Sequence, residues 1–282
     1  MTTKITVLCE NRSSDRKDIM GEHGFSVLIE KNGHNLLMDT GQGFTLQPNA
    51  RTLGIDLSSV NTLVISHGHF DHTGGLLDLF PAPPDIRLIA HPDIFTPKYA
   101  QHPPGHIPEY SFIGIRHARE CIESHFQTRF EFQTGFSKIQ DGIYFSGEIV
   151  KTTDFERPDS HLKLKTDDGY ITDPMKDDIS LLVETSKGPV IITGCAHSGV
   201  VNVIRHFENK TGYNKFYGLI GGTHLGFLNS DDQLARSIEA FESYGFELIA
   251  VSHCTGNEAA AACYNHFKDR FAFANAGWRI EL

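Results

Sequence analysis

Residues 63–72 read Leu-Val-Ile-Ser-His-Gly-His-Phe-Asp-His, and this stretch decides the fold. It begins with a short apolar run that is typical of a buried strand. Three imidazoles and one carboxylate follow directly, at His67, His69, Asp71 and His72. Loops at strand ends carry chemistry on a rigid scaffold, and imidazole and carboxylate are ligands of divalent zinc, iron and manganese. The stretch therefore predicts a metal-binding loop after a buried strand.

The composition of the 282-residue chain indicates the class of protein and its possible partners. With 39% hydrophobic and 21% charged residues, it is typical of a globular protein with ample core, and its length suits one large layered domain. The formal net charge of −10 argues against a nucleic-acid-binding surface. No apolar run is long enough to cross a membrane. We therefore expect a small-molecule substrate, with no nucleic acid and no membrane as partner, and the sequence sets no oligomeric state.

The cysteines and the first residues indicate a cellular location. Five widely spaced cysteines, an odd number, are not the pattern of a disulfide framework. The first five residues, Met1-Thr-Thr-Lys-Ile5, lack the apolar core of a signal peptide. A reducing, cytoplasmic environment is therefore expected.

Apolar periodicity predicts alternating strands and helices over most of the chain. We expect strands at residues 5–9, 25–30, 35–39, 62–65, 86–90, 179–184, 190–193, 216–220, 248–251 and 278–282, and helices at residues 200–207, 230–245 and 258–267. Ser230 is expected to cap the second of these helices. Between about residues 92 and 176 the pattern is irregular and rich in proline and glycine, so we expect an inserted cap there.

Histidines follow apolar strands at four places in the chain. Each strand ends in one or more small residues, and the histidine comes next, at His67, His197, His224 and His253. The ends of successive strands line up along one rim in a layered α/β domain, so these four loops are expected to converge. A lone histidine is more often a hydrogen-bonded structural residue, but the recurrence favours a metal site.

The number of candidate ligands predicts two metals. The candidates are His67, His69, Asp71, His72, His197, His224 and His253. A structural zinc takes about four ligands, and a catalytic zinc takes about three plus a water. Seven candidates therefore suit two adjacent divalent metals, which in such pairs lie roughly 3.5–4 Å apart. Zinc is the favoured metal, with iron or manganese as alternatives.

With these motifs the sequence resembles the metallo-β-lactamase superfamily. The segment His67-Gly-His69-Phe-Asp71-His72 matches the hallmark motif of that family, and the later histidines follow in family order. The resemblance implies a four-layer αββα sandwich with the metals at one edge, between the sheets. It assigns His67, His69 and His197 to the first metal and Asp71, His72 and His253 to the second. It also implies that Asp39 is structural and orients the metal loop.

The sequence departs from the family pattern at one position. The fourth family motif usually supplies an aspartate that bridges or supports the second metal, and His224 stands at the matching position here. Imidazole does not bridge two metals as a carboxylate does. Further runs, at residues 22–26, 142–148, 177–178 and 194–199, resemble a branch of metal-dependent hydrolases. That branch includes archaeal enzymes that join a dihydropterin to a ribofuranosylaminobenzene phosphate.

Other polar residues near these motifs have two interpretations each. His23 is a candidate for contact with the substrate or for a hydrogen bond to a metal ligand, and a capping or core role is equally compatible with its place before a strand. Cys195 and Cys254 flank ligand positions, where they could ligate a soft metal, although a small buried thiol is the commoner case. Asp177 and its neighbour either close a turn or hydrogen-bond to a ligating histidine.

The functional expectation is a metal-dependent hydrolase formed by one domain over residues 1–282, with the inserted cap at about 92–176. Metal-activated hydroxide would attack an ester, lactone, thioester or phosphoester-type substrate, and Asp71 would orient or deprotonate the water. One alternative is a transferase that condenses a dihydropterin phosphate with a ribofuranosylaminobenzene phosphate-like acceptor. Another is a di-iron redox protein, which His69 disfavours because the redox branch usually has a glutamate there.

Overall fold

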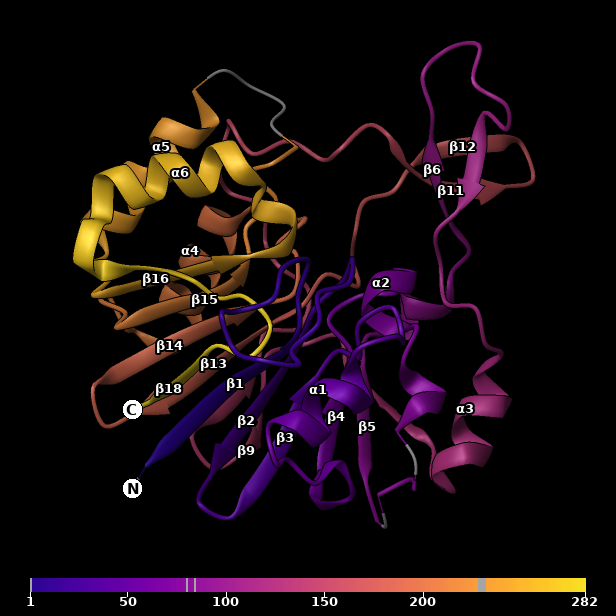
Figure 1. The fold of residues 1–282 in the computed structure, drawn as a ribbon. Helices are drawn as coiled ribbons and strands as arrows, with labels where there is room; N and C mark the ends of the chain where they lie inside the picture. The colour runs from indigo at the N-terminus through magenta and orange to yellow at the C-terminus, as the bar shows by residue number, and fades with distance from the viewer. Residues whose placement is uncertain (1, 80, 84, 228–231) are drawn as a thin grey trace.

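The computed structural model describes residues 2–79, 81–83, 85–227 and 232–282. Two seven-stranded sheets pack face to face, and helices cover both outer surfaces (Figure 1). The strand order in the first sheet is β18 (Arg279–Glu281), β1 (Thr3–Cys9), β2 (Ser26–Lys31), β3 (His34–Met38), β4 (Thr62–Val64), β5 (Arg87–Ala90) and β8 (Phe130–Phe132). The order in the second sheet is β17 (Phe271–Phe273), β16 (Leu248–Ser252), β15 (Gly218–Gly222), β14 (Gly188–Thr193), β13 (Ser180–Thr185), β10 (Ile143–Phe145) and β9 (Ser137–Gln140). The predicted four-layer αββα sandwich is confirmed.

The pairing directions bring the functional strand ends to one edge. In the first sheet, β4 runs parallel to β3 and β5. In the second sheet, β14, β15 and β16 run parallel to one another. Because parallel neighbours end at the same edge of a sheet, the segments that follow β14, β15 and β16 begin side by side.

Side chains from the facing strands fill the space between the two sheets. Val7 and Val27 from the first sheet share one buried cluster with Ile192 and Ile220 from the second. Inward-pointing residues recur with period two along a strand, so each sheet presents one apolar face to the other. Full burial of such a side chain contributes about 1.5–3 kcal/mol, which makes the sandwich a stable support for the loops at its edge.

Helices bury their apolar faces on the outer surfaces of the sandwich. On the first sheet lie α1 (Leu46–Thr52) and α3 (Arg119–Phe126), and the short helix α2 (Phe70–Thr73) begins within the metal-binding stretch. On the second sheet lie α4 (Val200–Thr211), α5 (Gln233–Ser243) and α6 (Asn257–Phe267). The three predicted helices correspond to α4, α5 and α6, but the expected cap residue Ser230 lies outside the described residues. No helix in the described parts of the chain is long and apolar enough to span a membrane.

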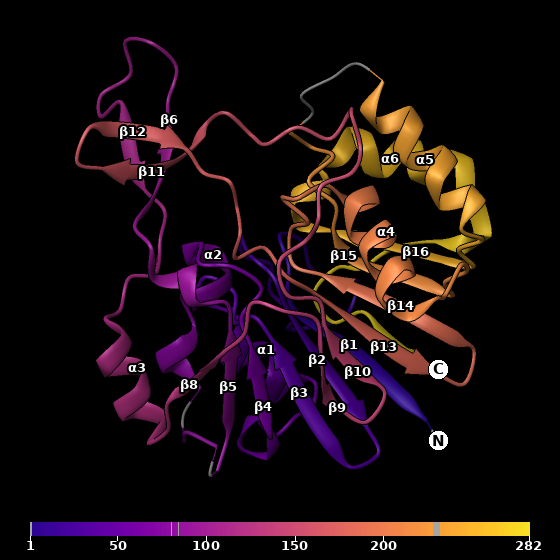
Figure 2. The same cartoon turned by 180° about the vertical axis from the view of Figure 1, so that it is seen from behind.

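A third, smaller sheet stands beyond the edge of the sandwich, on the side of α2 (Figures 1 and 2). Its strand order is β12 (Gly169–Thr172), β11 (Leu162–Thr166), β6 (Lys98–Gln101) and β7 (Tyr110–Phe112). All four strands fall within the predicted insertion at residues 92–176. The same stretch also contains α3 and the strands β8, β9 and β10, which belong to the sandwich itself.

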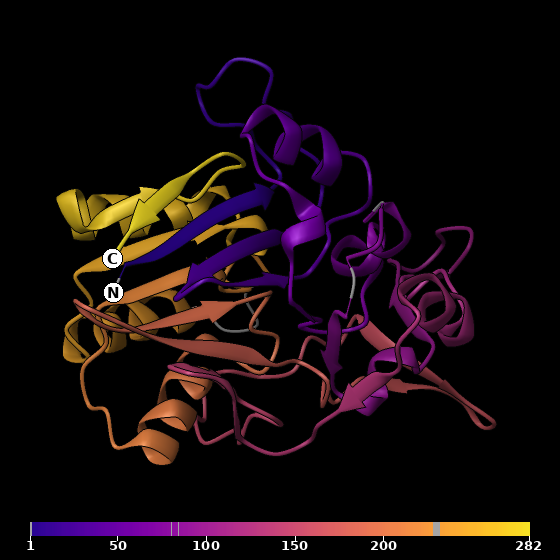
Figure 3. The ribbon, with the colours of Figure 1, turned by 90° about the horizontal axis from the view of Figure 1, so that it is seen from below.

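The two ends of the described chain lie side by side at the opposite edge (Figure 3). Strand β18 pairs with β1, and the backbone N–H groups of Thr3 and Leu282 each donate to the other residue's carbonyl oxygen at 2.8 Å. The strand predicted at residues 278–282 is present as β18, and it extends the first sheet.

Candidate metal centre

Asp39 supports the loop that follows β4. It lies directly after β3, is fully buried and has a left-handed backbone with φ of 62°. Its Oδ1 accepts a hydrogen bond from the Ser66 backbone N–H at 2.7 Å, and its Oδ2 accepts one from the Ser66 hydroxyl at 2.6 Å. The same Oδ2 lies 2.7 Å from Nδ1 of His72. These contacts are those of a residue that orients the loop.

Three imidazole nitrogens form a first cluster. Nε2 of His67 lies 3.0 Å from Nδ1 of His69 and 3.2 Å from Nε2 of His197. Two nitrogens bound to one tetrahedral zinc lie roughly 3.3 Å apart, because each Zn–N bond is about 2.0–2.1 Å long. The donor spacing therefore fits a single metal ion. Ser66 Oγ, 2.9 Å from Nδ1 of His67, turns that ring so that Nε2 faces the cluster.

One carboxylate and two imidazoles form a second cluster beside the first. Oδ2 of Asp71 lies 3.2 Å from Nε2 of His253 and 3.9 Å from Nε2 of His72, and the two Nε2 atoms are 3.3 Å apart. Asn11 Oδ1, 2.8 Å from Nδ1 of His253, fixes the orientation of that ring. The spacing again suits one metal ion. The first cluster is thus His67, His69 and His197, and the second cluster is Asp71, His72 and His253.

The pKa values of the three histidines in the first cluster are lowered by their surroundings. Burial lowers the pKa of His69 to about 3. Burial and the neighbouring imidazoles hold the pKa values of His67 and His197 well below the usual range. All three rings are therefore neutral near pH 7, which is the form that binds metals.

His72 differs from the first cluster in its charge. Burial lowers the pKa of His72, but the carboxylates of Asp39 and Asp71 outweigh that effect and raise it to about 9. A proton on Nε2 and a metal ion would compete for the same lone pair. The carboxylates that attract the proton attract a divalent cation as well.

His224 lies beside the first cluster but joins neither cluster. Its ring centroid is 4.3 Å from that of His197, and the ring stacks on Phe227 at 4.9 Å. Its Nε2 faces a carboxylate oxygen of Asp159 at 3.5 Å, without the geometry of a hydrogen bond. The groups of metal-compatible donors found among the described residues do not include His224.

His23 stands at the edge of the second cluster. Its Nε2 lies 3.2 Å from Oδ2 of Asp71, and its side chain is 55% exposed. The hydrogen bond to Asp71, opposed by partial burial, raises the pKa of His23 above its usual value. His23 is therefore the member of the group that communicates most directly with solvent.

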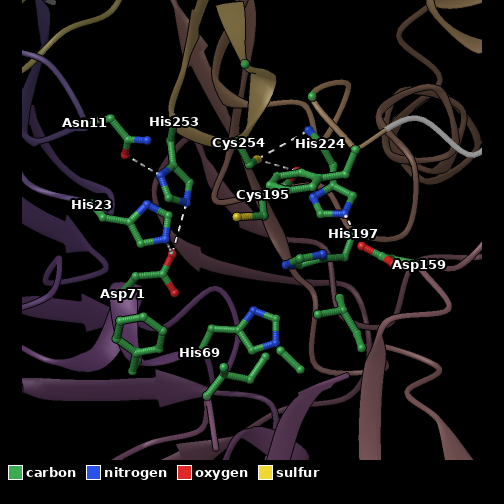
Figure 4. Close-up of a pocket in the computed structure, with 17 residues that line it drawn as sticks. Asn11, His23, His69, Asp71, Asp159, Cys195, His197, His224, His253 and Cys254 are labelled. Carbon is green, nitrogen blue, oxygen red and sulfur yellow. Dashed lines mark hydrogen bonds and ion pairs between the residues drawn. The ribbon is translucent and has the colours of Figure 1, made fainter. Parts of the chain in front are cut away.

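Two donors of each cluster, His69 and His197 from the first and Asp71 and His253 from the second, line one cavity of about 400 Å³ (Figure 4). Its lining combines donors from both clusters with apolar side chains that include Phe70 and Phe227. Ala100, Ile113 and Leu162, from the third sheet and its connections, form part of the wall. The lining contains no lysine or arginine among the described residues, and Asp159 contributes a carboxylate. A cavity of this size and character suits a small organic molecule.

Two supporting features were missed by sequence reasoning. Lys98, in β6, is buried and its Nζ donates to Asp173 and Asp177 at 2.8 Å each. Asp177 in turn accepts a hydrogen bond at 2.8 Å from the backbone N–H of Gly68, which lies between two ligand candidates. Asp159 is the second feature. Nothing in the local sequence separates Lys98 or Asp159 from ordinary surface residues, because their partners are distant in the chain.

Asp178 supports the segment that carries His197. Its Oδ2 accepts a hydrogen bond from the Ser198 backbone N–H at 2.8 Å, and burial raises the pKa of Asp178 to about 6. The paired aspartates therefore hold two different ligand-bearing loops through backbone groups. Their hydrogen bonds to these loops come from backbone N–H groups, not from the ring of a ligating histidine.

A family model and two curated relatives match most of this chain. The family model described as the metallo-beta-lactamase superfamily matches residues 20–253. Among curated proteins, a 7,8-dihydropterin-6-methyl-4-(beta-D-ribofuranosyl)-aminobenzene-5'-phosphate synthase from Methanocaldococcus jannaschii is 31% identical over 99% of this chain and 96% of its own length. An uncharacterised protein of the same organism is 32% identical over 90% of this chain and 91% of its own length.

Solved structures agree with this placement. A metal-dependent hydrolase of the β-lactamase superfamily superimposes with a TM-score of 0.83 at 28% identity, covering 99% of both chains. The zinc-bound PqqB of Methylobacterium extorquens has a TM-score of 0.55 at 12% identity and shares the fold alone. The family model and the full-length relative together establish that this chain belongs to the metallo-β-lactamase superfamily.

Proposed function

We propose that the chain is a metal-dependent hydrolase that acts on an ester, lactone, thioester or phosphoester-type small molecule at two adjacent metal positions. The observation that carries the proposal is the pair of donor clusters at the floor of one cavity. Neutral imidazoles with one carboxylate are donors that suit zinc, with iron or manganese as alternatives.

The chain supplies the positioning and the proton handling. Divalent metals held by the two clusters would polarise a substrate oxygen and lower the pKa of a water molecule toward neutrality. We assign the catalytic role to Asp71, because its Oδ2 lies 3.2 Å from the exposed His23 and equally far from the buried His253. The contact between Asp71 and the exposed His23 gives a proton released at the site a path to solvent. Phe70, Ile113 and Leu162 give the cavity an apolar wall beside these groups.

The test begins with metal content and continues with turnover. Protein purified without chelator is analysed for metal per chain and then assayed on phosphodiesters, lactones and thioesters. We expect two metals per chain and turnover that falls about 100-fold or more in Asp71→Asn. Asp168→Asn, an exposed carboxylate at the far end of the third sheet, is the matched control and keeps full turnover. One metal per chain, or an unchanged Asp71→Asn enzyme, contradicts the proposal.

A second candidate is a transferase that condenses a dihydropterin phosphate with a ribofuranosylaminobenzene phosphate-like acceptor. Similarity to the archaeal synthase over 99% of the chain favours it. Phe70 and Phe227 in the cavity wall also offer faces on which a planar ring can stack. Turnover that requires both organic substrates together, with none on single esters, would support this candidate over the hydrolase.

A further inference from the structure

The second cluster contains three donors, and a fourth donor lies against it. Sγ of Cys195 is 3.2 Å from Nε2 of His72. Cys195 also forms a metal-compatible group with His67 and His72, in which all donor atoms lie within 4.8 Å of one another. We propose that Cys195 is a fourth ligand of the metal held by the second cluster. This inference rests on the proposed two-metal centre.

Close backbone contacts fix the position of Cys195. A Cβ added to the preceding Gly194 would lie 2.3 Å from Ser66 Oγ, and one added to Gly222 would lie 3.2 Å from the Cα of Cys195. The segment after β14 is therefore pressed between the metal loop and β15, with Cys195 only 3% exposed. Figure 4 shows its side chain beside those of His197 and Cys254 at the cavity floor. The backbone that carries the Cys195 sulfur is therefore held in place by its neighbours.

The neighbouring Cys254 has other partners. Its Sγ accepts the backbone N–H of His224 at 3.3 Å, and its thiol donates to the carbonyl oxygen of Cys195 at 3.4 Å. Both contacts tie the segments after β14, β15 and β16 together. The Sγ of Cys254 also lies within 4.8 Å of donor atoms of Cys195 and His253, so Cys254→Ser, a change to a buried cysteine in the same cavity, tests whether this thiol binds the metal in place of Cys195.

Ligation by Cys195 makes the two metal positions unequal. Cysteine binds a metal as the thiolate, so coordination forms an S–metal bond and releases the thiol proton to solvent, with no change in oxidation state. Four protein ligands close a tetrahedral position, whereas three leave room for water. The second position would then be closed, and the first cluster, with three imidazoles, would keep the open place for water or substrate. A sulfur donor also favours zinc, cobalt or cadmium over manganese.

Cobalt substitution tests the inference directly. We expect cobalt-loaded wild-type protein to show a thiolate-to-cobalt charge-transfer band in the near ultraviolet. Cys195→Ser should lose the band and hold its second cobalt at least about 10-fold more weakly, while Cys254→Ser keeps the band. A band that is absent from the wild type, survives in Cys195→Ser, or disappears only in Cys254→Ser overturns the role of Cys195.

Two further observations keep the test decisive. Cadmium NMR of the unmodified protein reports sulfur ligation even if Cys195→Ser does not fold. One resonance in the thiolate range and one in the nitrogen and oxygen range are expected, and two resonances without sulfur ligation refute the inference. Failure of the wild type to bind any cobalt or cadmium would instead refute the metal-dependent function itself, so the two failures are distinguishable.

Discussion

His224 sits next to the first cluster without reaching it, and this placement leads to a prediction about metal content. Because its Nε2 faces Asp159 at 3.5 Å, we expect His224→Ala to keep both metals while its turnover falls. His69→Ala, which removes a donor 3.0 Å from His67 Nε2, should lose one metal. Elemental analysis of the two variants beside wild type decides the matter. Loss of a metal from His224→Ala would instead support the sequence-based prediction that this residue is a ligand.

Tyr213 leads to a prediction about pH. Its hydroxyl donates to Glu184 at 2.8 Å, and this bond, together with burial and the charge of Glu184, raises the pKa of Tyr213 to about 12. The unfolded chain has a tyrosine pKa of about 10. The neutral form is therefore favoured in the folded state, so the stabilisation is complete below pH 10 and is lost as the pH rises toward 12.

The measurement compares urea unfolding of wild type and Tyr213→Phe. We expect Tyr213→Phe to be less stable by about 1 kcal/mol at pH 7.5, with a smaller difference at pH 10.5. Tyr170→Phe is the control. The Tyr170 ring stacks on Tyr110 with centroids 3.8 Å apart, and its hydroxyl has no hydrogen bond among the described contacts. A difference for Tyr213→Phe that grows with pH would contradict the argument.

At the scale of elements, strand β6 of the third sheet is joined to the metal loop by buried charge. Lys98 holds Asp173 and Asp177, and Asp177 holds the backbone of Gly68. Lys98→Met would leave two carboxylates buried without a cation, and removal of one partner of a buried ion pair costs about 3–5 kcal/mol. We therefore expect Lys98→Met to lower the free energy of unfolding by about this amount. We also expect the variant to bind metal more weakly, because the metal loop loses its support.

Two further variants define this effect. Lys165→Met, on the exposed side of neighbouring β11, should change the unfolding free energy by less than about 0.5 kcal/mol. Combining Lys98→Met with Asp173→Asn and Asp177→Asn removes the unpaired charges and should recover much of the stability. Denaturant unfolding measures the free energy of unfolding, and chelator competition measures the metal affinity. If Lys98→Met unfolds like wild type, the network does not support the loop.

Some elements follow from local sequence and others do not. The apolar runs that form β4, β14 and β16 are recognisable in the sequence because a histidine follows each strand within one to four residues of its end. The strands of the third sheet alternate only weakly and are mostly half-buried, as in β11 and β12. Their order depends on pairing between β6 and β11, which are far apart in the chain. Long-range pairing of this kind leaves no local periodicity to detect.

The same distinction holds for the site. The residues of the first and second clusters are recognisable because metal ligands have few possible residue types and recur at strand ends. The direction in which a side chain turns is decided by its neighbours. His224 turns toward Asp159, and Cys195 toward His72, because of contacts between segments that only the fold brings together.

At the scale of the whole molecule, the two halves of the sandwich share the metal centre. His67 and His72 both follow β4 of the first sheet, whereas His197 follows β14 and His253 follows β16 of the second. Each cluster contains donors from both halves, so a bound metal would link the two sheets at their common edge. Between the sheets the apolar core holds them together without any metal. The edge and the core should therefore respond differently when metal is removed.

Chelation gives the last prediction. A ligand that binds only the folded state stabilises it by about 2.7 kcal/mol at 100 times its Kd, so we expect a chelator to lower the melting temperature. The far-ultraviolet circular dichroism should hardly change, because the core stays packed. Hydrogen exchange should quicken in the loops after β4, β14 and β16 and remain slow within the strands. The doubly substituted His69→Ala and His253→Ala protein, with one donor missing from each cluster, should respond far less to chelator. Equal responses of the two proteins, or protection lost evenly through both sheets, would show that the metals do not join the halves at this edge.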